Sequence, residues 1–357
     1  MQTTESLPGA AQSQRYDPRK LAFGTAFSET FFSAEYRDGA WREGRVEPLH
    51  NFSLHPATLV LHYAQTIFEG LKAFRQPDGS VGIFRADKNA RRFDDSARRM
   101  GMPPVGEQFF VDAVAAAVAA EKDNVLDYPG SLYIRPVMFA SEPHIGVRAA
   151  NEYIFFVMTL PAGAYFPDVI GSAGAVTVYV AQSVLRACPG GTGNIKTAAN
   201  YAVTLQITTE ARAAGCSQVL FLDSTPDRRI EEMGGMNIMF VEGDTVVTPP
   251  LGGTILPGVT RDAILQIARD LGINVREYAY TLAEMADGIR SGRIGEAYAC
   301  GTAAVITGIR EFKLEDGSTL TLQNAAPGPA TSRLFEELVG IQYGKRPDRH
   351  GWLRPVR

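Results

Sequence analysis

The sequence predicts a mixed α/β protein, with features of the α/β and α+β classes, that is built from two domains. A chain of 357 residues is long for one hydrophobic core. Short apolar runs typical of buried strands alternate with stretches of helical periodicity. Residues 163–174 are rich in Gly, Pro, Ala and Tyr, as linkers are. We therefore expect a disordered leader at 1–20, a small N-terminal domain at 21–162, a linker at 163–174 and a large C-terminal domain at 175–357.

The expected N-terminal domain contains a hairpin. Two apolar runs flank Gln76-Pro77-Asp78-Gly79, whose Pro and Gly favour a turn. The alanine-rich stretch that follows later has high helix propensity. In order, the predicted elements are strands at 71–74 and 81–84, helices at 86–99 and 108–124, and buried strands at 132–140 and 153–160.

The expected C-terminal domain alternates strands and helices again. Its predicted strands are 176–181, 218–223, 236–241, 245–248, 274–278 and a pair around 296–306. Glu242-Gly243-Asp244 is a turn signal that makes a hairpin of 236–241 and 245–248. Its predicted helices are 201–214, one that begins near Thr260, 282–290 and 331–341.

Composition excludes several classes of protein. The formal net charge of −4 comes without a long basic run, so nucleic acid is not an expected partner. No apolar run approaches the roughly 20 residues of a membrane span, and residues 1–15 lack the apolar core of a secretory signal, so we expect a cytoplasmic protein. The three cysteines and five histidines show no metal-ligand spacing, and we expect reduced thiols and no metal.

Lys196 is the residue that points most directly to chemistry. It lies in Gly-Thr-Gly-Asn-Ile-Lys-Thr-Ala-Ala-Asn-Tyr, where small residues surround one long amine and Tyr201 follows five positions later. A lysine amine shielded from water can attack an aldehyde, and small neighbours let a flat ring approach the backbone. This pattern is a candidate for covalent binding of an aldehyde cofactor.

A second segment, residues 230–238, carries two carboxylates before two glycines. Pyridoxal 5'-phosphate needs an amine for its aldehyde, an acid beside its pyridine nitrogen and donors for its phosphate. Glu232 is our choice for the acid, since Glu231 would point the opposite way in an extended segment. Residues 257–260 begin a helix whose free N–H groups and dipole suit the phosphate. Together these segments predict a pyridoxal-phosphate site.

The chain resembles the fold-type IV pyridoxal-phosphate enzymes, and among them the branched-chain amino-acid aminotransferases, from about Phe23 to Val356. The family motifs occur in order at residues 61–63, 68–74, 83–85, 132–136, 161–166, 191–201, 230–238, 256–261 and 300–304. The resemblance implies two mixed α/β domains with the cofactor between them. It also implies a dimer, because residues 142–147 match a loop that reaches the neighbouring subunit's site.

The resemblance implies a role for each candidate residue, with Lys196 as the catalytic residue. A guanidinium that donates paired hydrogen bonds to phosphate makes Arg85 the expected phosphate ligand. Consecutive N–H groups after Gly301 could hold the substrate carboxylate. The implied cofactor ligands are Lys196, Arg85, Tyr201, Glu232, Gly235, Met236, Asn237, Val259, Thr260 and Thr302. The implied substrate contacts are Phe27, Tyr63, Phe68, Tyr133, Arg135, Tyr165, Thr302 and Ala303.

The implied activity is transamination between L-leucine, L-isoleucine or L-valine and 2-oxoglutarate, which gives branched-chain 2-oxo acids and L-glutamate. A D-amino-acid aminotransferase and an aminodeoxychorismate lyase of the same fold are the alternatives, because they share the lysine and the acid. The chain departs from the family at Ala198-Ala199, where two glycines are usual. The two added methyl groups lie where the backbone should pass close to the cofactor.

Overall fold

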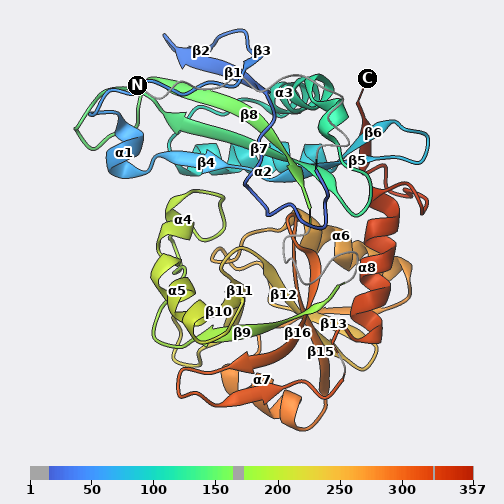
Figure 1. Ribbon diagram of the computed structural model, residues 1–357. Coiled ribbons are helices and arrows are strands. Elements are labelled where there is room, and N and C mark those ends of the chain that lie inside the picture. Colours follow the sequence, from blue (N-terminus) through green and yellow to red (C-terminus); the bar gives the residue numbers. More distant parts are fainter. Residues whose placement is uncertain (1–15, 164–172, 325, 357) are drawn as a thin grey trace.

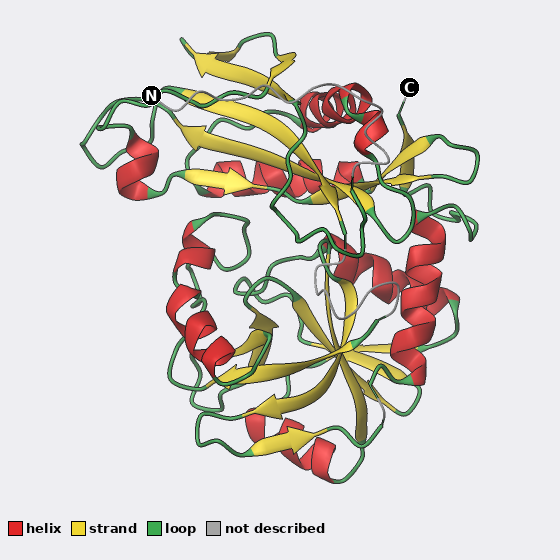
Figure 2. Ribbon diagram, viewed as in Figure 1, coloured by secondary structure: helices red, strands yellow, loops and turns green. Residues whose placement is uncertain are grey.

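The computed structural model describes residues 16–163, 173–324 and 326–356, and it contains two nine-stranded sheets. Figure 1 shows the two sheets as separate bodies, each with helices of its own. We call the boundary along which the two bodies meet the seam. Figure 2 shows the same view with helices, strands and loops in different colours, and both bodies contain helices and strands. The predicted mixed α/β fold is confirmed. The proposed leader, up to residue 15, and most of the proposed linker, residues 164–172, lie outside the described residues.

The first sheet has the strand order β18-β6-β5-β7-β8-β1-β2, with β3 paired to β1 and β4 paired to β7. Its helices α2 and α3 pack against each other, and α3 also packs on β1 and β8. Its strands are β1 (Thr30–Arg37), β2 (Ala40–Trp41), β3 (Arg45–Pro48), β4 (Thr66–Phe68), β5 (Leu71–Arg75), β6 (Val81–Phe84), β7 (Ser131–Ala140), β8 (Tyr153–Ala162) and β18 (Leu353–Pro355). Its helices are α1 (Leu59–Tyr63), α2 (Ala86–Arg99), α3 (Glu107–Ala120) and a 3-10 turn at Lys122–Asn124.

The two faces of this sheet have different chemistry, because side chains alternate along a strand. Residues such as Leu71, Leu132 and Ile134 belong to the apolar core that also contains residues of α2 and α3. Lys72 lies directly opposite Tyr133 in the β5–β7 register and therefore shares the other face with it. That second face carries the polar and aromatic side chains of the site described below.

The second sheet has the strand order β11-β10-β9-β16-β15-β12-β13-β14, with β17 paired to β16. Alternate residues of β12 enter two different cores, Ile238 and Phe240 on the α7 side and Met239 and Val241 on the side of α6 and α8. Its strands are β9 (Ala175–Ala181), β10 (Gln218–Leu222), β11 (Ile230–Met233), β12 (Asn237–Glu242), β13 (Thr245–Thr248), β14 (Asn274–Glu277), β15 (Ile294–Gly301), β16 (Val305–Lys313) and β17 (Thr319–Thr321). Its helices are α4 (Ala199–Ala202), α5 (Leu205–Ala213), α6 (Val259–Asp270), α7 (Leu282–Arg290) and α8 (Pro329–Gln342).

The structure differs from the predicted elements at several points. The single helix predicted at 201–214 is two helices, α4 and α5, because the N–H and the hydroxyl of Thr204 both donate to the carbonyl of Tyr201 and end the first helix there. Helix α1 and strands β1 to β4 and β17 were not predicted. The last strand, β18, pairs with β6 of the first sheet. The end of the chain therefore belongs to the first body, although the predicted C-terminal domain extended to residue 357.

The described part of the chain contains no helix that is both long and apolar enough to cross a membrane. Cys188, Cys216 and Cys300 are free thiols. No cluster of three or more His, Cys, Asp or Glu side chains in residues 16–163, 173–324 and 326–356 has the arrangement of a metal site.

Candidate active site

Lys196 lies at the seam between the two bodies, in the loop between β9 and α4. Backbone contacts with the first sheet hold this loop in place. The N–H of Lys196 donates to Oγ of Ser96 in α2 at 3.1 Å, and its carbonyl accepts from the N–H of Phe68 in β4 at 3.0 Å. The next residue, Thr197, forms a β-bridge with Ile67. The lysine belongs to a loop of the second body and is held by contacts with the first.

The Lys196 side chain is half-buried and ends among aromatic groups. Its Nζ donates to the hydroxyl of Tyr201 at 2.8 Å and lies 4.9 Å from the ring centre of Phe68. The rings of Phe68 and Tyr201 are 5.0 Å apart. Such walls exclude water from one side of the amine and fix its direction, which are the conditions for a nucleophilic lysine.

Glu232 is buried at the end of β11, with an exposed fraction of 4%. Its Oε1 accepts from the N–H of Leu256 at 2.9 Å, and its Oε2 accepts from Nδ2 of Asn237 at 2.9 Å. Burial raises the pKa of Glu232 to about 7, and the nearby guanidinium of Arg186 opposes that rise. The Glu232 carboxyl can therefore hold or release a proton near neutral pH.

Arg186 is part of this site and the sequence reasoning missed it. Its guanidinium forms a buried ion pair with Oε1 of Glu232 at 2.8 Å and also donates to the carbonyl of Thr254. Arg186 precedes Lys196 by ten residues in an irregular loop, so neither periodicity nor a turn signal marks it. Only the folded loop brings its charge to the acid.

Glu231, the neighbouring carboxylate, is also buried in β11. Burial raises its pKa as well. Glu232 faces a narrow cavity with Tyr201 and Gly235 among its lining residues, whereas Glu231 does not line that cavity. The alternation expected of an extended segment thus separates the two carboxylates.

Arg85 and the start of α6 form the second end of the site. Arg85 directly follows β6 and adopts a left-handed backbone conformation, φ 53°, as the N-cap of α2. Its guanidinium lies 2.5 Å from the carboxylate of Asp262 in the first turn of α6 and 3.5 Å from the carbonyl of Val259. Its Nε is buried and has no hydrogen-bond partner within the described chain. Arg85 thus reaches the start of α6 with its Nε–H group still available to a ligand.

The start of α6 has no side chain capping its first N–H groups. Gly258 is the N-cap, followed by Val259 and Thr260, both buried. A Cβ at Gly258 would lie 2.0 Å from Oδ1 of Asn237, so this close approach requires glycine. The same Asn237 binds Glu232, and it therefore links the acid to the helix start.

The turn between β15 and β16 contains Thr302 and Ala303. Lys72 of the first sheet donates from Nζ to the carbonyl of Ala303 at 2.9 Å. Burial lowers the pKa of Lys72 to about 8. Lys72 was not among the predicted site residues, although it lies in the motif at 68–74, and only the contact across the seam reveals its position.

The wall of the site beside Lys196 comes from β4 and β7. The guanidinium carbon of Arg135 lies 4.8 Å from the ring centre of Phe68, and its NH2 donates to the hydroxyl of Tyr133 at 3.0 Å. The Nε of Arg135 is buried without a partner in the described chain. Phe23, which was not predicted, packs edge-on against Tyr133 at 4.9 Å. A Cβ at Gly70 would strike the Tyr133 hydroxyl, so that glycine makes room for the wall.

The remaining predicted site residues fall into two groups. Met236 is buried against Gly301, and Gly235 lies within reach of Tyr201. Phe27 is 50% exposed and Tyr63 is 39% exposed, so neither side chain is enclosed in the site. Tyr63 instead donates to the carbonyl of Ile145, and Tyr165 lies outside the described residues. The structure thus assembles the predicted cofactor ligands more completely than the predicted substrate contacts.

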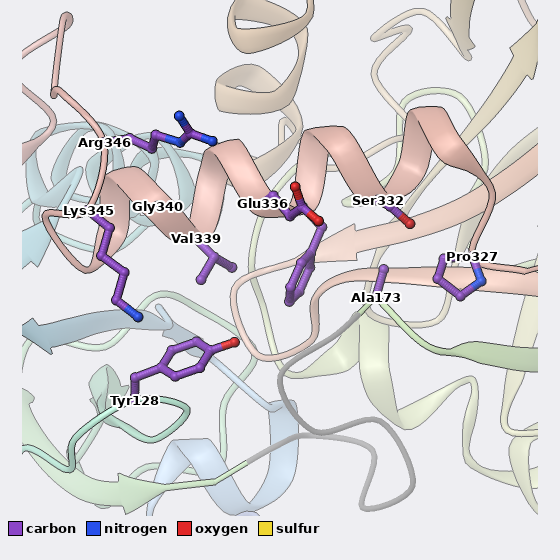
Figure 3. Close-up of a pocket in the computed structure, with 10 residues that line it drawn as sticks. Tyr128, Ala173, Pro327, Ser332, Glu336, Val339, Gly340, Lys345 and Arg346 are labelled. Atoms are coloured by element: carbon purple, nitrogen blue, oxygen red, sulfur yellow. The ribbon is translucent and has the colours of Figure 1, made fainter.

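A larger cavity, of about 570 Å³, lies away from these residues beside α8. Figure 3 shows its lining, in which Lys345 and Tyr128 face each other below the helix. The Nζ of Lys345 lies 4.2 Å from the Tyr128 ring centre. None of the predicted site residues lines this cavity, so its size does not make it the active site.

The seam residues fit pyridoxal 5'-phosphate. An ionised carboxylate offers about four lone-pair directions, and Glu232 uses three for Arg186, Leu256 and Asn237, which leaves one for a protonated ring nitrogen. The unpaired Nε of Arg85 and the uncapped N–H groups of α6 supply donors for a phosphate. Lys196 supplies the amine.

Comparison with known proteins identifies relatives. Residues 66–312 match the family model described as amino-transferase class IV. A probable branched-chain-amino-acid aminotransferase of Streptomyces coelicolor is 45% identical over 337 residues, which cover 94% of this chain and 92% of that protein. The crystal structure of the Escherichia coli branched-chain amino acid aminotransferase matches with a TM-score of 0.75 at 26% identity, covering 91% of this chain and 99% of that one.

A third relative is informative about the cofactor. The branched-chain amino acid aminotransferase from Thermobaculum terrenum, solved in its PLP-form, matches with a TM-score of 0.74 at 25% identity, covering 91% of this chain and 98% of that one. The region that matches the family model contains Lys196, Glu232 and the start of α6. The chain therefore belongs to the class IV aminotransferases, a family of enzymes that use pyridoxal 5'-phosphate.

Proposed function

We propose that this protein transfers the amino group of L-leucine, L-isoleucine or L-valine to 2-oxoglutarate, giving branched-chain 2-oxo acids and L-glutamate. The observation that carries the proposal is the position of Lys196 Nζ, between the Tyr201 hydroxyl and the aromatic wall begun by Phe68. The names of the Streptomyces coelicolor and Escherichia coli relatives support the same substrate class.

Each seam residue has a distinct task in this proposal. Bound pyridoxal 5'-phosphate supplies an electron sink for the substrate Cα. Lys196 Nζ holds the cofactor. It also acts as the general acid and base that moves a proton to and from that carbon. Glu232 keeps a proton on the ring nitrogen, and Tyr201 orients the ring through its hydroxyl. Arg85 and the start of α6 bind the phosphate.

The substrate side of the seam explains the preference for apolar side chains. Phe68 and Tyr133 present ring surface, and an unpaired charged side chain against such a wall would lose its hydration without compensation. Thr302 and Ala303 offer backbone N–H groups for the α-carboxylate. Lys72 holds this turn in place, because its Nζ donates to the carbonyl of Ala303. Arg135 is the cation on this wall that can receive the second carboxylate of glutamate.

A substrate panel tests the function directly. The protein loaded with pyridoxal 5'-phosphate should convert to the pyridoxamine form with L-leucine, L-isoleucine, L-valine and L-glutamate, followed by absorbance. L-aspartate and D-alanine should leave the spectrum nearly unchanged, because the side-chain carboxylate of L-aspartate is one methylene shorter than that of L-glutamate and D-alanine has the opposite configuration. Faster conversion by D-alanine than by L-leucine would overturn the proposal in favour of a D-amino-acid aminotransferase. Release of a product without conversion of the cofactor would favour a lyase.

Replacing Arg135 by methionine should separate the two classes of substrate. Methionine keeps much of the aliphatic length but loses the charge, so the half-reaction with L-glutamate should slow by about 10- to 100-fold. The L-leucine half-reaction should change by less than about threefold. Single-turnover conversion of the loaded protein with each amino acid measures both rates.

The control is Arg91→Met, in which an exposed arginine of α2 that pairs with Glu107 is changed in the same way. It should leave both half-reactions unchanged. Equal losses with L-glutamate and L-leucine in Arg135→Met would show that Arg135 only supports Tyr133 and Phe68.

We also propose a homodimer. Residues 142–147 lie against the start of α1, through the bridge between Thr58 and Pro143, and the Tyr63 hydroxyl at the end of α1 donates to the Ile145 carbonyl. Ile145 and Val147 are exposed. Exposed apolar side chains such as Ile145 and Val147 are suited to burial against a second copy. Sedimentation equilibrium measures the assembly, and a monomer would contradict the proposal. The cytoplasmic location stays a prediction from the sequence.

A further inference from the structure

The end of the chain lies directly beside Arg85. Strand β18 pairs antiparallel with β6, and the register places Leu353 opposite Phe84, the residue before Arg85. The carbonyl of Trp352 accepts the N–H of Arg85 at 2.8 Å. Figure 1 shows the C-terminus at the β6 edge of the first sheet, above α8. A segment more than 250 residues away in the sequence therefore borders the expected phosphate ligand.

The Trp352 side chain also contacts the Arg85 guanidinium. The Arg85 Cζ lies 4.8 Å from the centre of the indole ring, within the range of a cation–π contact. His350 stacks on the same indole with 4.6 Å between ring centres, and its Nε2 lies 2.6 Å from the Asp270 carboxylate at the end of α6. Phe84 meets the indole edge-on at 5.7 Å. The indole is thus held by groups from β6 and, through His350, from α6.

Arg85 needs such support for two reasons. Its backbone occupies the left-handed region, which costs a residue other than glycine roughly 1 kcal/mol, so neighbouring contacts must hold it there. Its long side chain has many rotamers, and ordering it for one ligand costs about 1–2 kcal/mol. A contact that restricts the guanidinium before the ligand arrives reduces that cost.

We propose that Trp352 is a positioning residue that holds the Arg85 guanidinium in place for the phosphate of the cofactor. This inference rests on the proposed role of Arg85 in the aminotransferase site. Trp352 acts through Arg85 and not on the reacting atoms. Loss of the indole should therefore weaken retention of the phosphorylated cofactor while leaving the chemistry at Lys196 intact.

The competing explanation is that Trp352 merely packs against Phe84 and fills the core beneath α8. A packing role would affect the whole fold and would not depend on the phosphate. Pyridoxal, which has the aldehyde but no phosphate, distinguishes the two explanations, because it binds Lys196 without using Arg85.

The test compares Trp352→Leu with Trp352→Phe in cofactor-free protein. Trp352→Leu keeps an apolar side chain but removes the ring face, and it should raise the dissociation constant for pyridoxal 5'-phosphate about tenfold. The dissociation constant for pyridoxal should change by less than about twofold. Trp352→Phe restores a ring and should recover much of the lost affinity. Absorbance titration gives both constants, and kcat at saturating cofactor should stay near the wild-type value.

The chain offers a matched control, since Trp41 is its second and last tryptophan. Trp41 lies in β2 with its indole N–H on the carbonyl of Pro104, and Trp41→Leu should change neither constant. Trp41→Phe leaves Trp352 as the sole indole, and its fluorescence should be quenched as cofactor binds. In an Arg85→Gln background, Trp352→Leu should cause no further loss of affinity.

Equal weakening of pyridoxal and pyridoxal 5'-phosphate by Trp352→Leu would show a packing role only and overturn the inference. Unchanged affinity for both in the folded variant would overturn it too, and circular dichroism with a melting curve establishes that the variant is folded. Failure of the proposed function would look different, because the wild-type protein itself would then fail to bind the cofactor or to convert L-leucine.

Discussion

Replacement of Lys196 by alanine should reduce turnover by at least about 10⁴-fold, the largest effect expected for any single residue of this chain. The substitution removes both the amine that holds the cofactor and the group that moves the substrate proton. The fold should survive, because the backbone contacts of Lys196 with Ser96 and Phe68 do not involve its side chain. Steady-state rates with L-leucine and 2-oxoglutarate measure the loss.

Covalent attachment gives an independent measurement. Borohydride reduction of the loaded wild-type protein, followed by peptide mapping, should place the pyridoxyl group on Lys196. Lys88→Ala changes a lysine of α2 near the same seam and should retain both turnover and label. A label on Lys72 or Lys88, or turnover in Lys196→Ala within about tenfold of wild type, would contradict the assignment.

Elements with a local signal could be predicted from the sequence. Helix α7 has the predicted bounds because Thr281 and Glu284 form a capping box that sets its start. The β5–β6 hairpin follows from Pro77 and Gly79 between two apolar runs. The break between α4 and α5 could not be predicted, since it depends on how Thr204 turns its hydroxyl to the carbonyl of Tyr201.

The site residues also fall into those with a local sequence signal and those without one. Lys196, Tyr201 and Glu232 lie in short motifs with recognisable spacing, and the structure brings them to one seam. Arg186 carries no such local signal, and the motif that contains Lys72 does not indicate its contact with Ala303. Their positions depend on a loop conformation and on the packing of two sheets, which are properties of the whole chain. Long-range contacts of this kind cannot be read from periodicity or turn signals.

Glu232→Gln should lower kcat by about 10²-fold or more, which corresponds to roughly 2.7 kcal/mol of transition-state stabilisation. Glutamine keeps the size and the hydrogen bond from Leu256 but cannot carry the charge that holds a proton on the ring nitrogen. Cofactor affinity should fall much less, because that charge stabilises the transition state more than the bound ground state. Steady-state kinetics and absorbance titration give the two quantities.

Stability against pH gives a second signature of Glu232 in cofactor-free protein. Its folded pKa of about 7 exceeds the ordinary 4.5, so between these values the folded protein keeps a proton that the unfolded chain has released. Stability must therefore fall as pH rises through that window, by at most about 1.4 kcal/mol per pH unit for one group. The unfolding free energy of wild type relative to Glu232→Gln should decline from about pH 4.5 to 7 and level off outside this range.

Glu231→Gln is the matched control, and it separates burial from function. Burial raises the pKa of Glu231 too, so its replacement should also alter the pH dependence of stability in the same direction. Glu231 does not line the cavity that Glu232 shares with Tyr201, so its replacement should leave kcat within about threefold of wild type. A larger catalytic loss in Glu231→Gln than in Glu232→Gln would assign the ring nitrogen to the other carboxylate. A pH effect on stability without a catalytic loss in Glu232→Gln would show that Glu232 is a buried acid and nothing more.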